Sequence, residues 1–340
     1  MEQLGARMVE RGHQVIVYCR SGHFEAHPRA FRGMQLTYLP AIRRKHVETL
    51  SHTALSALRV PPDASIICMG AGNAPVVALL ERIGRRTVFN VDGADWQRQK
   101  WGGFARWYLH KCELLAARGR SILVADAESV QHYYWNEYRR ATEFVAYGAE
   151  PPYDTGAQAL TRFNLTPGSY ALHVGRLVPE NAAHEFLDGM ALAKTTMIPV
   201  VVGDAPYSDA YRAHVRATAP RGTVFTGYQF GIGYQQLTVH AKVFVLAATV
   251  GGTHPVLVEQ MAAGKCVLAR DTASNREVLG DAGLLWTTPS ELAECLRRVD
   301  GDGELRFQLG QAAAKRVATR YNWNQVTDRY LELCELVAPR

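Results

Sequence analysis

The 340-residue sequence has no apolar run long enough to cross a membrane and no signal-peptide pattern at its start. Its cysteines, at positions 19, 68, 112, 266, 295 and 334, form no C-x-x-C pair and no zinc spacing, so we read them as reduced, mostly buried thiols. No G-x-G-x-x-G follows a strand-like segment in the first half, which disfavours a dinucleotide oxidoreductase. The net charge of +6 is unclustered, which disfavours a nucleic-acid binder. It fits phosphate-bearing substrates or an anionic membrane surface, although ordinary surface charge is the simpler reading.

Apolar and polar segments alternate along the chain in the pattern of parallel α/β domains. Strand-like segments lie at 14–20, 35–39, 65–69, 86–91, 121–125, 142–146, 170–177, 199–204, 222–227, 242–248, 266–270 and 283–286, with helical ones near 48–58, 74–83, 101–118, 127–138 and 303–338, the last broken at 321–326. We therefore predict two doubly wound, Rossmann-like domains at 1–150 and 169–320. The Pro/Gly-rich segment 151–168 would link them, and a C-terminal helix at 321–340 would pack back toward the first domain.

The first helix comes too early for this pattern. MEQLGARMVERGH reads as an amphipathic helix closed by Gly12, and the strand at 14–20 follows it directly. In a parallel α/β domain a strand and a loop precede such a helix. We therefore expect the first domain to lack its first strand, because the start is misassigned, the chain is a fragment or the domain is truncated.

The most informative stretch is VGGTHPVLVEQMAAG at 250–264. Pro255 at the first helical position and Gly264 just past the last predict a short, sharply bounded helix. Its start offers unpaired N–H groups and a positive dipole end, and Gly251 lets a ligand approach the backbone, which suits the pyrophosphate of a sugar nucleotide. Glu259, about one turn inside, could accept hydrogen bonds from ribose hydroxyls. A plain strand–turn–helix unit explains the segment equally well.

Several segments together resemble the group 1, family-four retaining glycosyltransferases, which have the GT-B fold of two Rossmann-like domains facing a cleft. The nearest likeness is to the bacterial rhamnosyltransferase-like subgroup that builds surface polysaccharides. The resemblance covers essentially the whole chain and rests on EQLGARMVERGHQVIVYCR (2–20), NVDGADWQRQKW (90–101), YGAEPP (147–152), VGRLVPEN (174–181), VGGTHPVLVEQMAAG (250–264) and NREVLGDAGLLW (275–286). Relatives carry a Gly-rich loop after their first strand, which this chain does not supply.

The resemblance implies a donor site in the second domain. Arg176 of the G-R motif would clamp the pyrophosphate, although a lone Arg there can also form a surface salt bridge. Many relatives have a Lys where this chain has Asn181. Of the two Glu residues of the wider family, Glu259 matches the second, which would bind ribose, and Gly251 replaces the first, so backbone N–H groups of 252–256 are the expected substitutes. The expected donor-binding residues are Arg176, Asn181, Gly252, Thr253, His254, Pro255 and Glu259.

In the first domain, the resemblance points to the end of the strand at 86–91, where many relatives have a His and this chain has Asp92. Asp92 could position or polarise a hydroxyl near the anomeric carbon, or it could simply form a turn. Just beyond it, polar groups alternate with aromatic faces, which suits a saccharide acceptor. The expected acceptor-side residues are Asp95, Trp96, Arg98 and Lys100. Core packing of one Trp is the alternative, expected for Trp101 before Trp96.

We therefore predict a retaining glycosyltransferase that moves a hexose or a deoxyhexose such as rhamnose from a nucleotide-sugar to a saccharide or lipid-linked acceptor in surface polysaccharide synthesis. The family likeness implies no metal and no other cofactor, and the chain has no DxD-type acidic pair at a donor loop. We expect a cytoplasmic protein, peripheral at the inner membrane face through basic residues at 43–45. A non-catalytic or truncated GT-B paralogue that binds nucleotide, and a sugar-nucleotide epimerase, are the alternatives.

Overall fold

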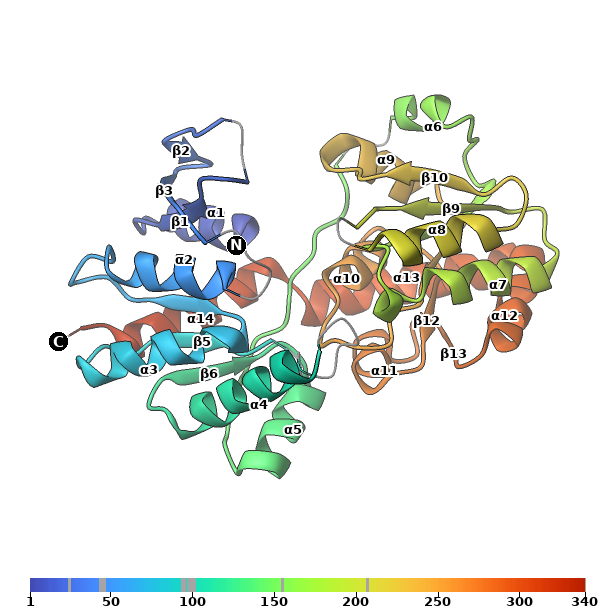
Figure 1. Ribbon diagram of the computed structural model, residues 1–340. Helices are drawn as coiled ribbons and strands as arrows, with labels where there is room; N and C mark the ends of the chain where they lie inside the picture. The colour runs from blue at the N-terminus through green and yellow to red at the C-terminus, as the bar shows by residue number, and fades with distance from the viewer. Residues whose placement is uncertain are drawn as a thin grey trace. The chain divides into compact units, whose positions relative to one another are not determined.

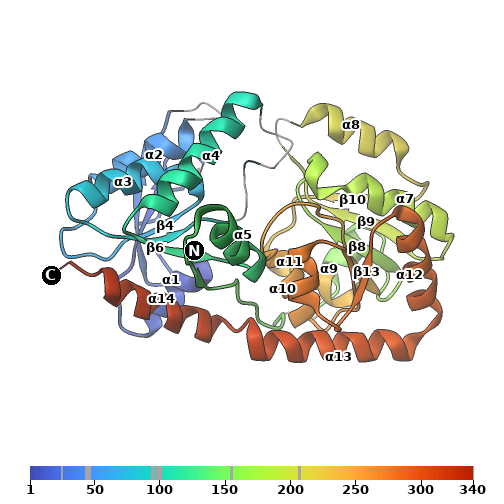
Figure 2. The same cartoon turned by 90° about the horizontal axis from the view of Figure 1, so that it is seen from below.

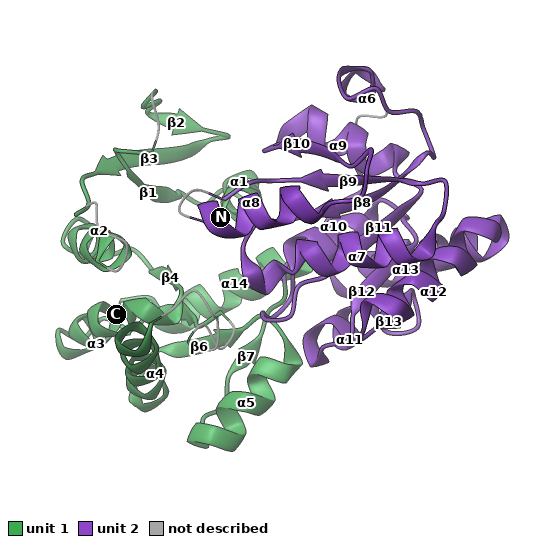
Figure 3. Cartoon of the chain, turned by 45° about the vertical axis from the view of Figure 1, so that its right-hand side comes forward, with its two compact units in different colours: residues 1–97, 101–146, 323–340 green, residues 98–100, 147–322 purple. Residues whose placement is uncertain are grey.

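The computed structural model describes residues 1–23, 26–42, 47–92, 96, 102–153, 156–205 and 208–339. They form two compact units, coloured separately in Figure 3. Unit 1 holds the described residues of 1–146 together with 323–339, and unit 2 holds those of 147–322. The chain therefore leaves unit 1 once and returns to it near its C-terminal end (Figure 1).

Strands and helices alternate in unit 1, as the sequence pattern predicts. Its elements are α1 (Glu2–Glu10), β1 (Ile16–Arg20), β2 (Ala30–Phe31), β3 (Met34–Leu39), α2 (Glu48–Ala57), β4 (Ile67–Met69), η1 (Ala71–Asn73), α3 (Ala74–Arg82), β5 (Val88–Asn90), α4 (Gly103–Arg118), β6 (Ile122–Ala125), α5 (Glu128–Tyr138), β7 (Glu143–Phe144) and α14 (Trp323–Val337). The short strand β2, which no sequence pattern predicts, runs antiparallel to β3.

Helices cover both faces of the parallel sheet β4-β5-β6-β7. Val88 and Val124 point to the face that α1 and α14 cover, where Tyr330 joins the same core cluster. The neighbouring residues Phe89 and Leu123 point to the opposite face, in a second cluster with α3, α4 and α5. This two-residue alternation is the period of a strand, and it gives the sheet a core on each side. Figure 2 shows α1 and α14 side by side along this sheet.

Unit 1 contains a second, separate sheet with the order β1-β3-β2. Among the described strands, β1 pairs only with β3, and β4 pairs only with β5. All five residues of β1 are only partly buried, although its sequence IVYCR is mostly apolar. The two sheets share α1, which packs against β3 while Leu4 and Met8 join the core beneath β5 and β6. Two groups of parallel strands thus flank one helix without forming one continuous sheet.

Unit 2 is a doubly wound domain with one six-stranded parallel sheet. Its elements are α6 (Gln158–Arg162), β8 (Tyr170–Val174), η3 (Pro179–Asn181), α7 (Ala183–Ala193), β9 (Ile198–Val202), α8 (Asp209–Thr218), β10 (Val224–Gly227), α9 (Gly231–His240), β11 (Val243–Leu246), α10 (Pro255–Ala262), β12 (Val267–Arg270), α11 (Ala273–Leu279), β13 (Leu284–Trp286), α12 (Pro289–Gly301) and α13 (Gly303–Arg320). The central strand β11, VFVL, is buried along its whole length, as expected for a parallel strand covered on both faces.

The strand order of unit 2 is β10-β9-β8-β11-β12-β13. The chain therefore builds outward from β8 to β10, and then reverses direction by placing β11 on the other side of β8. Open parallel sheets bind ligands beyond the carboxyl ends of the strands at such a reversal point. The ends of β8 and β11 are thus where a ligand of unit 2 is expected.

The segment 151–168, expected as a linker, is partly folded into unit 2. It contains α6, whose Leu160 is buried. The backbone N–H of Ala159 donates to the Gln236 side chain on α9, which fixes α6 to the unit. The helix break expected at 321–326 spans only the two residues between α13 and α14.

Candidate active site

The loops that follow β8 and β11 lie side by side at the reversal point of unit 2. Both the backbone N–H and the Oγ1 of Thr249 donate to the carbonyl of Glu180, at 2.9 and 3.1 Å. On the other side, the loop after β8 touches the end of β9, because a Cβ on Gly203 would lie 2.1 Å from the carbonyl oxygen of Gly175. Gly203 also has a positive φ of 121°, so this close approach requires glycine.

Two residues at the start of α11 hold the loop after β11 from its far side. The Ser274 hydroxyl donates to the Gly251 carbonyl at 2.8 Å, and the Asn275 side chain donates to the carbonyls of Ala248 and Arg270 at 3.4 and 2.9 Å. Sequence reasoning did not identify these two residues. The signal was present in D-T-A-S-N after β12, a cluster of small polar residues at a helix start, where Thr272 is the N-cap.

Arg176 lies just beyond β8, is exposed, and has no ion-pair partner among the described residues. Several other arginines of unit 2 are engaged: Arg270, for example, pairs with Glu185. The predicted neighbour Asn181 donates from Nδ2 to the Arg176 carbonyl at 2.9 Å, so it shapes the loop that carries the guanidinium. The guanidinium of Arg176 is therefore available to an anion, in contrast to the surface salt bridge that the sequence left open.

The helix α10 begins at Pro255, as predicted, and the side chain of its N-cap residue, His254, makes no capping hydrogen bond. Pro255 has no N–H, and the Leu257 N–H donates to the His254 carbonyl at 2.9 Å. What this helix start offers an anion is therefore the N–H of Val256 and the positive end of the helix dipole. Gly252 and Thr253, which precede it, are buried. Gly251 has φ +146°, and a Cβ there would lie 2.7 Å from Cε1 of His254. The His254 imidazole thus occupies the space that a side chain at position 251 would need.

Glu259 lies in the second turn of α10, where its Oε2 accepts a 2.7 Å hydrogen bond from the hydroxyl of Tyr234 on α9. Burial raises the pKa of the Glu259 carboxyl, and the hydrogen bond from Tyr234 partly offsets that rise. Burial also raises the pKa of Tyr234 well above its usual value, so this hydroxyl stays a donor. Sequence reasoning missed Tyr234 because it lies 25 positions away on another helix.

His173 is a buried titratable group next to the predicted donor residues. Its Nδ1 donates to the Val245 carbonyl at 3.1 Å, and its ring stacks on Phe186. Burial lowers the pKa of His173 to about 4, so the imidazole is neutral at physiological pH. It therefore links β8 to β11 by a hydrogen bond and adds no charge to the site.

The predicted catalytic residue Asp92 lies in unit 1, just after β5, with φ +58°. Its backbone N–H donates to Oδ1 of Asn90 at 2.8 Å, and Nδ2 of Asn90 donates to the Tyr330 hydroxyl on α14 at 2.9 Å. The C-terminal helix therefore fixes the backbone of the loop that carries Asp92. A left-handed φ is unusual for residues other than glycine but is well tolerated by Asp.

The predicted acceptor-side residues Asp95, Arg98 and Lys100 lie outside the described residues, as do Trp101 and the basic residues 43–45. Trp96 is described and partly buried. Its indole N–H donates to the Tyr133 hydroxyl at 3.1 Å, and that hydroxyl donates to the buried Glu113 carboxylate at 2.8 Å. Trp96 is thus held at one edge by a polar network.

Within the described ranges, no group of three or more His, Cys, Asp or Glu side chains is arranged to hold a metal ion. The expectation of a metal-free reaction stays a prediction. No helix in the described part of the chain is long and apolar enough to span a membrane.

Comparison with known families bears on both units. The family model described as "Glycosyl transferases group 1" matches residues 168–302, which include β8, β11 and α10. This segment of unit 2 is therefore similar to the group 1 glycosyltransferases. A second model, "Domain of unknown function (DUF1972)", matches residues 66–150 of unit 1. Among curated proteins, no sequence matches the chain.

Solved structures show which fold the chain has. Sucrose-phosphate synthase from Thermosynechococcus elongatus is 17% identical, with a TM-score of 0.81 over 98% of this chain and 91% of that one. HepE from Anabaena in complex with UDP-glucose is 16% identical, with a TM-score of 0.76 over 90% and 87%. WaaG, a glycosyltransferase involved in lipopolysaccharide biosynthesis, is 15% identical, with a TM-score of 0.73 over 98% and 94%. The chain has the GT-B fold, as predicted.

Proposed function

We propose that this chain is a retaining glycosyltransferase that uses a nucleotide-sugar donor. The observation that carries the proposal is the arrangement in unit 2, where the unpaired Arg176 and the uncapped start of α10 lie on the two loops at the reversal point. The group 1 domain supports the same reading. So do the structural neighbours, since HepE was solved with UDP and with UDP-glucose.

Each residue then has a separate role. When the bond between the anomeric carbon and the donor oxygen breaks, negative charge develops on the leaving nucleoside diphosphate. Arg176 stabilises that charge together with the start of α10, through the Val256 N–H and the positive end of the helix dipole. The second carboxylate oxygen of Glu259 accepts hydrogen bonds from the ribose, while Tyr234 holds the first oxygen. Asp92 of unit 1 has the role that the family resemblance implies, which is to position a reacting hydroxyl.

Calorimetry with UDP and dTDP tests the donor site. Arg176→Ala should weaken binding of both nucleotides strongly, because a hydrogen bond to a charged group contributes about 1.5–3 kcal/mol. Glu259→Ala should weaken the binding of UDP more than that of dTDP, because dTDP lacks the 2′-hydroxyl. Arg221→Ala, which removes an exposed arginine elsewhere in unit 2, is the matched control. Unchanged affinity in folded Arg176→Ala would refute the donor-site assignment.

We further propose that the donor sugar is a hexose or deoxyhexose, with rhamnose favoured, and that the acceptor is a saccharide or a lipid-linked saccharide at the cytoplasmic membrane face. Product analysis with dTDP-rhamnose and UDP-glucose discriminates between the donor sugars. Co-sedimentation with liposomes, with and without anionic lipid, tests the membrane association. Equal and negligible binding to both liposomes would contradict it.

We also propose that one more strand belongs between β1 and β4. The support is the interrupted pairing in unit 1, where β1 and β4 are each paired on one side only and the two sheets share α1. The incomplete burial of β1 points the same way. A strand parallel to both would join them into one sheet. Adding an apolar strand and a short loop before residue 1 should raise the melting temperature of unit 1. If the 340-residue chain melts as cooperatively as the extended one and transfers sugar equally well, this proposal fails.

A further inference from the structure

A transferase needs a second binding site, for the acceptor, and the donor motifs of unit 2 do not supply one. The inference below rests on the proposed function and concerns where the acceptor is held. The predicted acceptor-side residues Asp95, Arg98 and Lys100 are not described by the structure. The described part of unit 1 contains a different candidate, a cavity of about 220 Å³.

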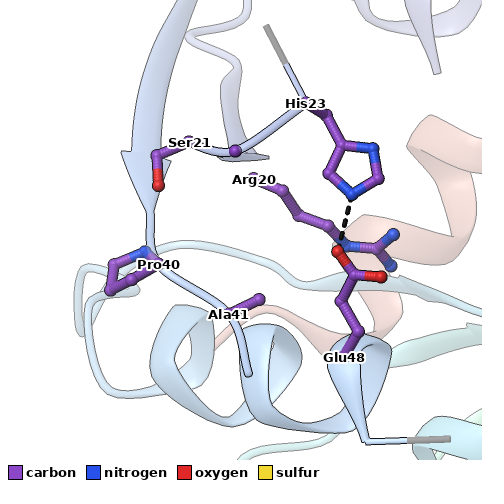
Figure 4. A pocket seen from close by; sticks show the side chains of 7 residues that line it. Arg20, Ser21, His23, Pro40, Ala41 and Glu48 are labelled. Carbon is purple, nitrogen blue, oxygen red and sulfur yellow. Dashed lines mark hydrogen bonds and ion pairs between the residues drawn. The ribbon is translucent and has the colours of Figure 1, made fainter. Parts of the chain in front are cut away.

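The cavity lies at the carboxyl ends of β1 and β3, the edge at which parallel sheets bind ligands. It is lined by Arg20, Ser21, Gly22, His23, Pro40, Ala41 and Glu48. In Figure 4 the His23 imidazole and the Arg20 side chain lie on the same side of the Glu48 carboxylate, and Ser21, Pro40 and Ala41 lie across the cavity from them. Its volume suits a single sugar ring or a comparably small polar group.

Hydrogen bonds fix the polar side chains of the cavity. Nη2 of Arg20 donates to Oγ1 of Thr49 at 2.9 Å, which leaves the other N–H groups of the guanidinium for a ligand. Nε2 of His23 lies 2.6 Å from Oε1 of Glu48. Both contacts reach the first turn of α2, so that turn orients the charged groups of the cavity.

A further polar group lies on the same face of α2. His52 is four residues after Glu48, so the two side chains are neighbours along the helix. It is 9% exposed, and its Nε2 has no hydrogen-bond partner among the described residues. His52 is not among the residues that line the cavity, so it lies beside the site and is not one of its contacts.

The mixture of donors and acceptors selects the kind of ligand. An anion would meet the Arg20 guanidinium, but it would also meet the Glu48 carboxylate, and like charges at close range repel strongly. A sugar hydroxyl both donates and accepts, so a ring with adjacent hydroxyls can bind a carboxylate and a guanidinium together. We propose that this cavity binds one neutral sugar ring of the saccharide acceptor, with Arg20 and Glu48 as its main contacts and Thr49 as a positioning residue.

Solution NMR of the full ¹⁵N-labelled chain tests the proposal with L-rhamnose, D-glucose and inorganic phosphate as probes. At least one sugar should shift the amide signals of 20–23 and 48–49, and phosphate should not. Glu48→Gln should weaken sugar binding roughly tenfold, as expected for loss of a charge-assisted hydrogen bond. Thr49→Val should also weaken it, because Arg20 loses its orienting contact. Glu10→Gln, which removes an exposed carboxylate of unit 1, should bind sugar like the parent.

Three outcomes would overturn the proposal: shifts at these amides with phosphate instead of sugar, sugar shifts elsewhere only, and sugar affinity that is unchanged in both variants. A UDP titration of the same sample reports separately on unit 2. If UDP binds through Arg176 while both sugars leave 20–23 and 48–49 unaffected, the acceptor site is refuted and the proposed function stands. If UDP fails to bind, the donor assignment is at fault instead.

Discussion

Gly251→Ala should disrupt the candidate donor site through a contact that is visible in the structure. The new methyl carbon would lie 2.7 Å from Cε1 and 3.1 Å from Nε2 of His254, well inside van der Waals contact. The backbone is also in the region that L residues rarely adopt, at φ +146°. Either the imidazole moves away or the loop that precedes α10 shifts, and both change what the loop presents to a ligand.

The magnitude can be separated into two parts. Backbone strain at a positive φ costs about 1–2 kcal/mol for a residue with a Cβ. Forcing an extra carbon into an occupied space adds about 1–3 kcal/mol. At about 2–4 °C per kcal/mol for a unit of this size, the melting temperature of unit 2 should fall by more than strain alone produces. UDP affinity should fall as well, because the N–H groups that follow Gly251 move with the loop.

Gly222→Ala is the matched control, because Gly222 has φ +87° and no atom within 4 Å of its hypothetical Cβ. It carries the backbone strain without the collision. Calorimetric melting and UDP titration of both variants, and of Gly251→Ala with His254→Ala, measure the difference. The double variant should recover the stability that is lost to the collision but not the stability that is lost to backbone strain. If Gly251→Ala melts and binds UDP like Gly222→Ala, the reasoning about His254 is wrong.

Three further predictions concern buried polar groups. His173 has its pKa lowered to about 4, from about 6.5 in an unfolded chain. Below pH 6.5 the unfolded chain takes up a proton at His173 that the folded chain takes up only near pH 4. The free energy of unfolding should therefore fall by about 3 kcal/mol as the pH is lowered from 6.5 to 4. In urea melts at several pH values, His173→Asn should flatten this dependence, and an unchanged slope would contradict the assignment. Tyr234→Phe removes the hydrogen bond that lowers the pKa of Glu259, so the carboxylate should become protonated at a higher pH. When the pH is lowered in a calorimetric series, UDP affinity should therefore begin to fall at a higher pH than in the parent. An identical pH profile would contradict this. Tyr330→Phe leaves the Asn90 amide without its buried partner and should cost about 1–3 kcal/mol in denaturant melts, with UDP affinity unchanged; a parent-like melt would contradict it.

The sequence was sufficient for the features that depend on neighbours along the chain. Pro255 and Gly264 bound α10 as predicted, because a helix start tolerates Pro and a helix end favours Gly. The alternation of apolar segments located every described strand except β2, including β5 before Asp92. Family resemblance added the order and spacing of the motifs, and with them the GT-B fold.

Contacts between distant segments could not be predicted in the same way. The hydrogen bond from Tyr234 to Glu259 and the bond from Ser274 to Gly251 each join residues more than twenty positions apart. No local pattern encodes them, since they depend on which strands become neighbours. The position of the His254 ring over Gly251 is local in sequence, but it follows from a backbone conformation that only the folded loop defines.

The return of α14 to unit 1 bears on how the chain is built on the ribosome. Domains generally fold as they emerge, the N-terminal one first. Here residues 147–322, which form unit 2, are complete while unit 1 still lacks α14. Tyr330 and Leu333 of that helix fill the core beneath β5 and β6. Unit 1 therefore begins to be synthesised before unit 2 but is completed after it.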